Sequence, residues 1–203
     1  MNNIIYFNKY TKERGASLMC PPINRIYGKT PTEILNEYGD MHHIPINLSN
    51  LLENIGISAL PMNFTNLEKM LNKGHILGLV LKDSKNAVIY YSSDDSVNRQ
   101  RFTIAHELGH ICNNLIPDSN DYPYIDWRIE EESETDREKV ANIFAGELLI
   151  PLPILKDVYM SMTFPFSSDL AKRFGTSINV MEERLNYLKV SYYNREGQAV
   201  IYE

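Results

Sequence analysis

The sequence predicts an α+β fold in which a small antiparallel sheet precedes a group of helices. Two β-type runs, residues 75–81 and 87–91, are joined by five polar residues, which suit a hairpin turn in length and composition. The segment that follows has apolar side chains at helical spacing, namely Ile104, Leu108, Ile111 and Leu115. Beyond residue 133 further helical segments follow, separated by proline and glycine.

Length and composition favour one compact unit. The chain has 203 residues, a net charge of −6 and a pI near 5.4, so no direct nucleic-acid binding is expected. Only Cys20 and Cys112 are present, and we see neither a leader-like start nor a membrane-length apolar run. We expect a cytoplasmic, disulfide-free protein with an N-terminal extension (1–30), a main domain (31–160) and a C-terminal helical hairpin with its tail (161–203).

The first half of the main domain carries two short helix signals. Thr30 caps a helix over residues 31–38 that ends at Gly39, and a second helix over residues 48–54 ends before Gly56. His42 and His43 are neighbours in an extended segment, where consecutive side chains point to opposite sides. They cannot both face one metal ion, so we expect both at the surface.

The helix after the hairpin contains the pattern H-E-x-x-H, formed by His106, Glu107 and His110. On a helix the two histidines lie one turn apart on the same face, so both imidazoles can reach one ion. Glu107 stands at the edge of that face, where its carboxylate can touch a metal-bound water without ligating the metal. This is the zinc-hydrolase pattern, and it predicts a catalytic zinc site.

Residues 114–132 read as a long loop with aromatic side chains, packed over a cleft. A helix follows, with Ser133 as its expected N-cap. Glu138 shares one stripe of that helix with Ala141 and Ala145, whose small side chains would let the helix approach the first one closely. Burying an unpaired carboxylate is costly, so we expect Glu138 to face the metal. The alternative is that it merely favours the dipole of the first turn.

The C-terminal part has helix-turn-helix spacing. Residues 167–174 and 180–188 read as two helices around Gly175 and a cap at Ser177, and a small hairpin closes the chain. Contact with DNA is one interpretation. Glu182 and Glu183 would repel phosphates from the second helix, which favours a structural helical hairpin.

Three segments together resemble the ImmA/IrrE family of metallopeptidases. They are residues 101–110 (RFTIAHELGH), 138–151 (EKVANIFAGELLIP) and 170–177 (LAKRFGTS), and the resemblance extends over about residues 31–188. It implies a zincin-like domain that binds one zinc ion per chain through His106, His110 and Glu138, with Glu107 as the catalytic base. Members often carry a second acid just before the Ala-Asn pair. Here Val140 stands at that point, which leaves Glu138 as the better third ligand.

The resemblance also implies a function. The family is associated with cleavage of helix-turn-helix repressors, so the expected activity is that of an endopeptidase acting on one cytosolic DNA-binding repressor. A further group should steady the oxyanion, and Tyr122, Tyr124 and Arg101 are candidates by position alone. Two alternatives stay open, a non-proteolytic metal-binding regulator and a toxin–antitoxin component acting through a bound partner. We further expect an extended substrate to dock along the strand over residues 87–91.

Overall fold

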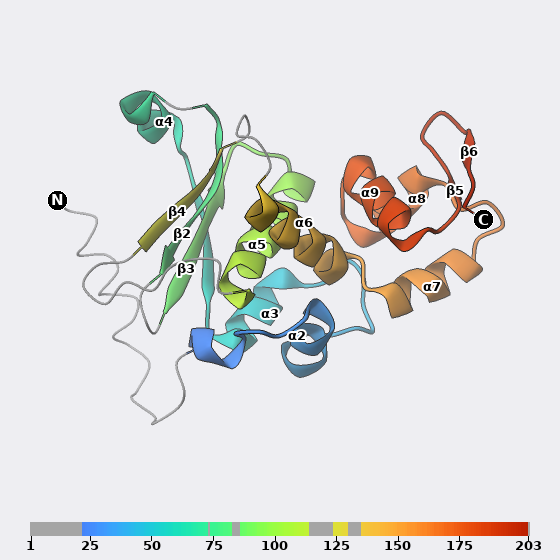
Figure 1. The fold of residues 1–203 in the computed structure, drawn as a ribbon, viewed down its shortest axis with the longest axis horizontal. Coiled ribbons are helices and arrows are strands. Elements are labelled where there is room, and N and C mark those ends of the chain that lie inside the picture. Colours follow the sequence, from blue (N-terminus) through green and yellow to red (C-terminus); the bar gives the residue numbers. More distant parts are fainter. Residues whose placement is uncertain (1–21, 73, 83–85, 114–123, 130–134, 203) are drawn as a thin grey trace.

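A computed structural model describes residues 22–72, 74–82, 86–113, 124–129 and 135–202, with the backbone alone for residues 22 and 124–129. Figure 1 shows a sheet at one end, a central pair of helices, α5 and α6, and a C-terminal group of helices at the other end. Most of the N-terminal extension, including Cys20, lies outside the described residues.

Short helices form the N-terminal part, namely η1 (Pro22–Arg25), α2 (Pro31–Tyr38), α3 (Leu48–Ile55) and α4 (Thr65–Leu71). The predicted caps of α2 and α3 are confirmed. Thr30 and Glu33 form a reciprocal capping box at α2, which satisfies backbone N–H groups of the first turn, and Gly56 ends α3 in the left-handed conformation. The sequence analysis did not anticipate α4. His42 and His43 are exposed, as expected.

The sheet has four strands in the order β1-β3-β2-β4, with β1 at Ser58–Met62, β2 at Ile76–Lys82, β3 at Ala87–Ser92 and β4 at Tyr124–Ile129. The predicted β2–β3 hairpin is confirmed, and β1 adds to β3 in parallel. Three expectations were wrong. The sheet is mixed rather than antiparallel, because β1 runs parallel to β3. Residues 124–129 are an edge strand antiparallel to β2 rather than loop, and β3 is an inner strand with both edges paired. A substrate therefore cannot extend the sheet at β3.

Two helices cross beside this sheet. Ser96 caps α5 (Val97–Cys112), which packs on β2 and β3, and α6 (Asp136–Leu149) packs on α5 (Figure 1). The cap of α6 is Thr135, whose hydroxyl accepts from the backbone N–H of Glu138, and not Ser133 as expected. The helix thus begins two residues after the expected cap would place it, because threonine offers the same capping oxygen closer to the apolar stripe.

The C-terminal part consists of α7 (Leu152–Met160), α8 (Ser167–Phe174), α9 (Ile178–Leu188) and a hairpin of β5 (Tyr192–Tyr193) and β6 (Ala199–Val200). Gly175 turns the chain between α8 and α9 with a positive φ of 64°, and Ser177 caps α9. Ser167 Oγ donates to Glu182 Oε1 at 2.7 Å, so this acid joins the two helices to each other.

One cluster of buried apolar side chains runs through most of the described fold. It begins at Ile23, passes through α2, α3, α5, α6, α8 and α9, and ends at Tyr192. The C-terminal helices therefore share a core with the helices beside the sheet. No helix within the described ranges combines the length and apolar character that a bilayer crossing requires.

Candidate metal centre

The metal centre depends on a close approach between α5 and α6. Gly109 in α5 faces the ring of Phe144 in α6, and a Cβ at Gly109 would lie 3.1 Å from that ring. On α6 the side chains of Ala141 and Ala145 are fully buried. Small side chains at the crossing thus let the two backbones approach, as the stripe of alanines predicted.

Three side chains converge across this crossing. The Nε2 atoms of His106 and His110 lie 2.9 Å apart, and the two oxygens of Glu138 lie 3.0 Å and 3.2 Å from His106 Nε2 and His110 Nε2 respectively. Both histidines are buried, whereas the Glu138 side chain keeps 28% of its exposure. Among the described residues this is the group of histidine, cysteine and acidic side chains whose spacing suits a metal ion.

Asn142 fixes the orientation of the first histidine. It follows Glu138 by one turn of α6, and its Oδ1 lies 2.8 Å from His106 Nδ1. An amide oxygen can only accept, so Nδ1 carries the proton and Nε2 keeps its lone pair toward Glu138 and His110. The sequence analysis gave Asn142 no role, although its i, i+4 spacing from Glu138 was visible in the sequence.

The three groups suit zinc by their chemistry and their spacing. Two imidazoles and one carboxylate form a known ligand set for catalytic zinc, and ligand atoms about 2.0–2.1 Å from a tetrahedral ion stand roughly 3.3 Å apart. The observed separations are close to that value. The imidazoles of His106 and then of His110, which lie against its two oxygens, hold the pKa of Glu138 well below its usual range. Glu138 is therefore an anion, as a metal ligand must be.

Glu107 is buried between α5 and the sheet. It retains 1% of its exposure, and a Cβ added to Gly78 of β2 would lie 2.9 Å from its Oε1. Glycine at this position is therefore what leaves room for the carboxylate. Glu107 is next in the chain to a metal ligand but does not belong to the three-residue cluster itself.

Of the three candidates for stabilising the oxyanion, the structure describes the side chain of Arg101 alone. Arg101 donates from Nε to the carbonyl of Gly175 at 3.0 Å and from Nη2 to that of Ile46 at 2.9 Å, so it ties α5 to two distant segments and is not retained for this role. Tyr124 has its backbone in β4, opposite Lys82, while its side chain and all of Tyr122 lie outside the described residues.

Comparison with known proteins shows which family the chain belongs to. The profile of the IrrE N-terminal-like domain, peptidase family M78, matches residues 59–186, which is more than half of the chain. The radiation response metalloprotease IrrE of Deinococcus radiodurans is 29% identical over 113 residues, which make up 54% of this chain and 29% of that relative. This chain thus spans less than a third of the relative's length. From the extent of the family match, the chain belongs to the ImmA/IrrE family of metallopeptidases.

Proposed function

We propose that this protein is a zinc-dependent endopeptidase with a zincin-like fold. The proposed zinc ligands are His106, His110 and Glu138, and the proposed catalytic base is Glu107. The observation that carries the proposal is the convergence of the three ligand atoms from two helices, 2.9–3.2 Å apart, beside a buried glutamate. A purely structural zinc site would take a fourth protein ligand and would not require that glutamate.

In this proposal each of the chain's own side chains has a defined task. Bound zinc would supply Lewis acidity, which lowers the pKa of a coordinated water to about 7 and polarises a carbonyl. Glu107 takes the proton of the attacking water at a carboxylate oxygen and passes it to the nitrogen of the leaving amine. Asn142 holds the ring of His106 so that Nε2 stays directed at the ligand cluster. Tyr122 and Tyr124 remain candidates for steadying the oxyanion.

The substrate we propose is a helix-turn-helix transcriptional repressor, cleaved in the cytosol at an extended segment. A DNA-binding protein carries surplus positive charge, and the net charge of −6 on this chain would attract it. We expected the extended substrate to dock along β3, but β3 is an inner strand, so the substrate must dock at another edge of the sheet. Since Gly78 of β2 lies against Glu107 and β4 is the outer strand next to β2, the edge of β4 that no other described strand pairs with is the better site for an added strand.

The test is cleavage of the helix-turn-helix repressor encoded beside this protein. Zinc-loaded wild type should produce discrete fragments of the repressor, whereas Glu107→Gln at the same zinc content should produce none. The substitution removes the base and leaves every proposed ligand in place. Equal loss of repressor with both proteins would indicate a contaminating protease. A stable complex without cleavage by either protein would favour the non-proteolytic regulator or the toxin–antitoxin component.

A further inference from the structure

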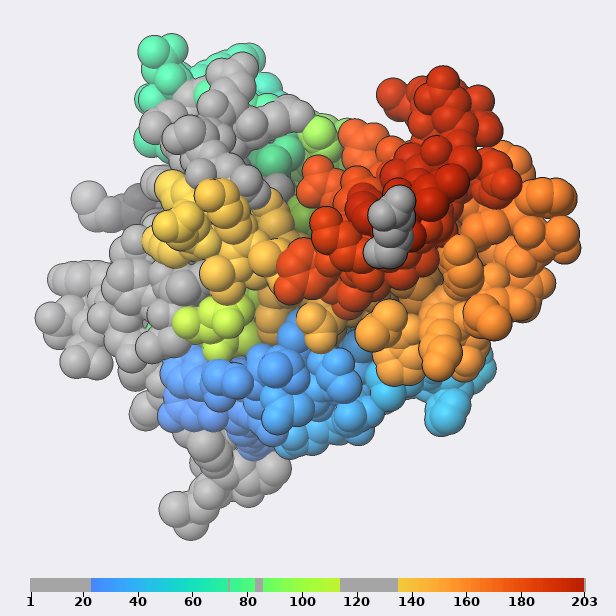
Figure 2. Space-filling model, turned by 45° about the vertical axis from the view of Figure 1, so that its right-hand side comes forward, coloured from blue at the N-terminus to red at the C-terminus, as the bar shows by residue number. Residues whose placement is uncertain are grey.

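A pocket of about 660 Å³ lies between α6 and α9, with Phe102 of α5 contributing to its wall. Figure 2 shows α6, in gold, and α9, in orange-red, side by side across one face of the molecule. The volume is within the range of small-molecule sites. None of the three proposed zinc ligands lines this pocket, although Asn142, which holds His106, does. The pocket is therefore separate from the metal centre and lies next to it.

A buried arginine lines this pocket. Arg184 of α9 retains 6% of its exposure, and its one hydrogen bond to another described residue is a long one, from Nε to the carbonyl of Ile150 at 3.4 Å. Its guanidinium lies 5.6 Å from the ring centroid of Tyr187. No carboxylate of the described residues comes within ion-pair distance of it. Glu147 acts on the charge of Arg184 only from beyond that distance. Arginine keeps its charge even when buried, so among the described residues the guanidinium is a cationic donor fork with no carboxylate in direct contact.

The rest of the lining suits a ligand with an anionic head and an apolar body. Asn186 Oδ1 accepts hydrogen bonds from the hydroxyls of Tyr192 and Tyr202, so the amide N–H groups are what Asn186 can offer to a ligand. Apolar side chains form much of the remaining wall, namely Phe102, Ile143, Val180 and Tyr187. Guanidinium and amide donors together recognise carboxylate or phosphate oxygens, and the aromatic walls accept a flat ring.

We propose that this pocket binds a small ligand with one carboxylate or phosphate group on an aromatic body, with Arg184 as the partner of the anion. This site is independent of peptide hydrolysis, so it stands whether or not the proposed function is correct. Glu183 also lines the pocket and is its one carboxylate, while Lys139 is an exposed cation of the same lining. Because their charges are opposite, removing each charge should change the affinity for an anion in opposite directions, and neither substitution changes the buried arginine.

The test measures binding of four probes to the full chain by ligand-observed NMR and calorimetry. Benzoate and phenyl phosphate should bind and show which anion is preferred, while inorganic phosphate and the neutral benzamide should bind about tenfold more weakly or worse. Arg184→Gln, checked for folding by thermal unfolding, should lower the affinity for the preferred anion by about tenfold or more. Equal affinity for benzamide, unchanged affinity of Arg184→Gln, or no binding of either aromatic anion would overturn the proposal.

Two surface variants keep the test decisive if Arg184→Gln fails to fold. Glu183→Gln removes a negative charge from the lining and should tighten binding of the preferred aromatic anion. Lys139→Gln removes a positive charge and should weaken it. Neither substitution touches a proposed zinc ligand or the base. If the two variants change the affinity in the same direction, or neither changes it, the anion does not bind in this pocket and the proposal is wrong.

Discussion

Replacing Gly78 with alanine tests how the sheet supports the proposed base. Gly78 lies in β2, and a Cβ there would meet Thr103 Cγ2 at 2.6 Å, Glu107 Oε1 at 2.9 Å and the carbonyl oxygen of Tyr90 at 3.3 Å. Two of these atoms belong to α5 and the third to the neighbouring strand β3. The added methyl group therefore cannot be accommodated by one flexible side chain, and β2 must move away from α5.

Overpacking of this kind costs about 1–3 kcal/mol of the free energy of unfolding. For a chain of this size each kcal/mol lowers the melting temperature by about 2–4 °C, so Gly78→Ala should melt about 2–12 °C below the wild type. Gly146→Ala is the matched control. Its Cβ would meet only Arg184 Cδ, at 3.9 Å, inside helix α6. Alanine there should raise stability by about 0.5–1 kcal/mol, since glycine is the poorer helix former.

The assay is thermal unfolding followed by circular dichroism on metal-free protein, combined with zinc analysis and repressor cleavage. Gly78→Ala leaves the ligands on α5 and α6 untouched, so it should keep its zinc. It displaces the Glu107 carboxylate, so it should lose most hydrolysis. A Gly78→Ala protein as stable and as active as the wild type would refute the close contact between β2 and Glu107.

Two further predictions concern hydrogen bonds near the site and the sheet. Asn142→Ala removes the acceptor of His106 Nδ1 and should weaken zinc binding by about 10–100-fold in a chelator competition, and an unchanged zinc affinity would contradict its orienting role. Burial alone lowers the pKa of His75, but hydrogen bonds to Asp95 and Glu68 outweigh burial and raise it. Protonated His75 thus contributes to the free energy of unfolding. The contribution is fully present below the unfolded pKa of about 6.5 and is lost as the pH rises through the higher folded pKa. The stability deficit of His75→Gln in denaturant titrations should therefore be larger at acidic than at alkaline pH, and a deficit independent of pH would refute the assignment.

Helix ends could be predicted from the sequence where a single residue type decides them. Thr30, the expected cap, accepts from the backbone N–H three residues on, and Gly56, expected just after the second helix, supplies the left-handed residue that ends it. These are local interactions, so a short window of sequence contains them. The expected start of α6 was two residues too early. Ser133 and Thr135 can both act as a cap, and a short window of sequence does not decide between them.

Strand partners could not be predicted in the same way. β1 contains Pro61 and shows no clear alternation of exposure, and it pairs with β3, which begins 25 residues after β1 ends. β4 follows a run of turn-forming residues, 117–123, and was expected to be loop. Pairing of this kind is decided by contacts distant in the sequence. The addition of β1 makes β3 an inner strand, and the addition of β4 beside β2 supplies the revised docking edge.

The candidate site was more accessible to prediction than the sheet, because metal ligands are constrained by chemistry as well as by packing. The i, i+4 spacing of His106 and His110 and the small residues around Glu138 were enough to indicate their convergence. The task of Arg101 was not visible, since its carbonyl partners at Gly175 and Ile46 lie far away in the sequence. Side chains that act through distant backbone groups leave no local pattern.

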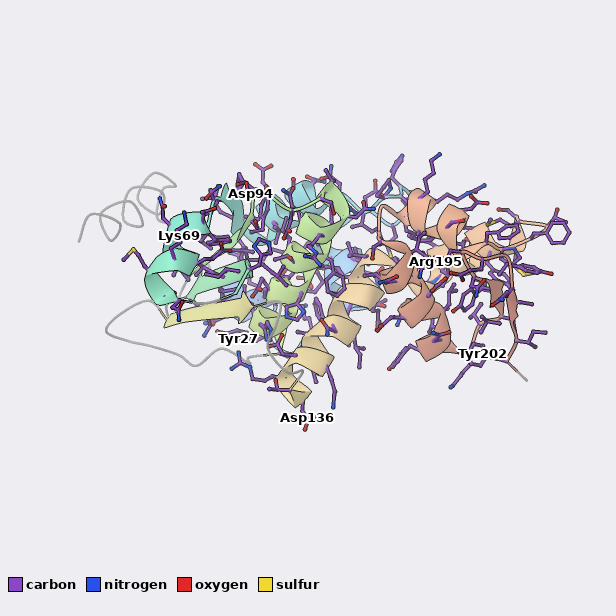
Figure 3. The ribbon with its side chains drawn as sticks, turned by 90° about the horizontal axis from the view of Figure 1, so that it is seen from above. Tyr27, Lys69, Asp94, Asp136, Arg195 and Tyr202 are labelled. Carbon is purple, nitrogen blue, oxygen red and sulfur yellow. The ribbon has the colours of Figure 1, made fainter. Side chains whose placement is uncertain are left out.

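The zinc content of three proteins purified without a metal-affinity column tests the central claim most directly. Asp136 is the matched control for Glu138, because it lies in the same first turn of α6 with 99% of its side chain exposed (Figure 3). The wild type and Asp136→Ala should each carry about one zinc per chain, and Glu138→Ala should carry far less. Full zinc in Glu138→Ala, or a wild type that stays nearly metal-free after zinc is added, would contradict the proposed centre.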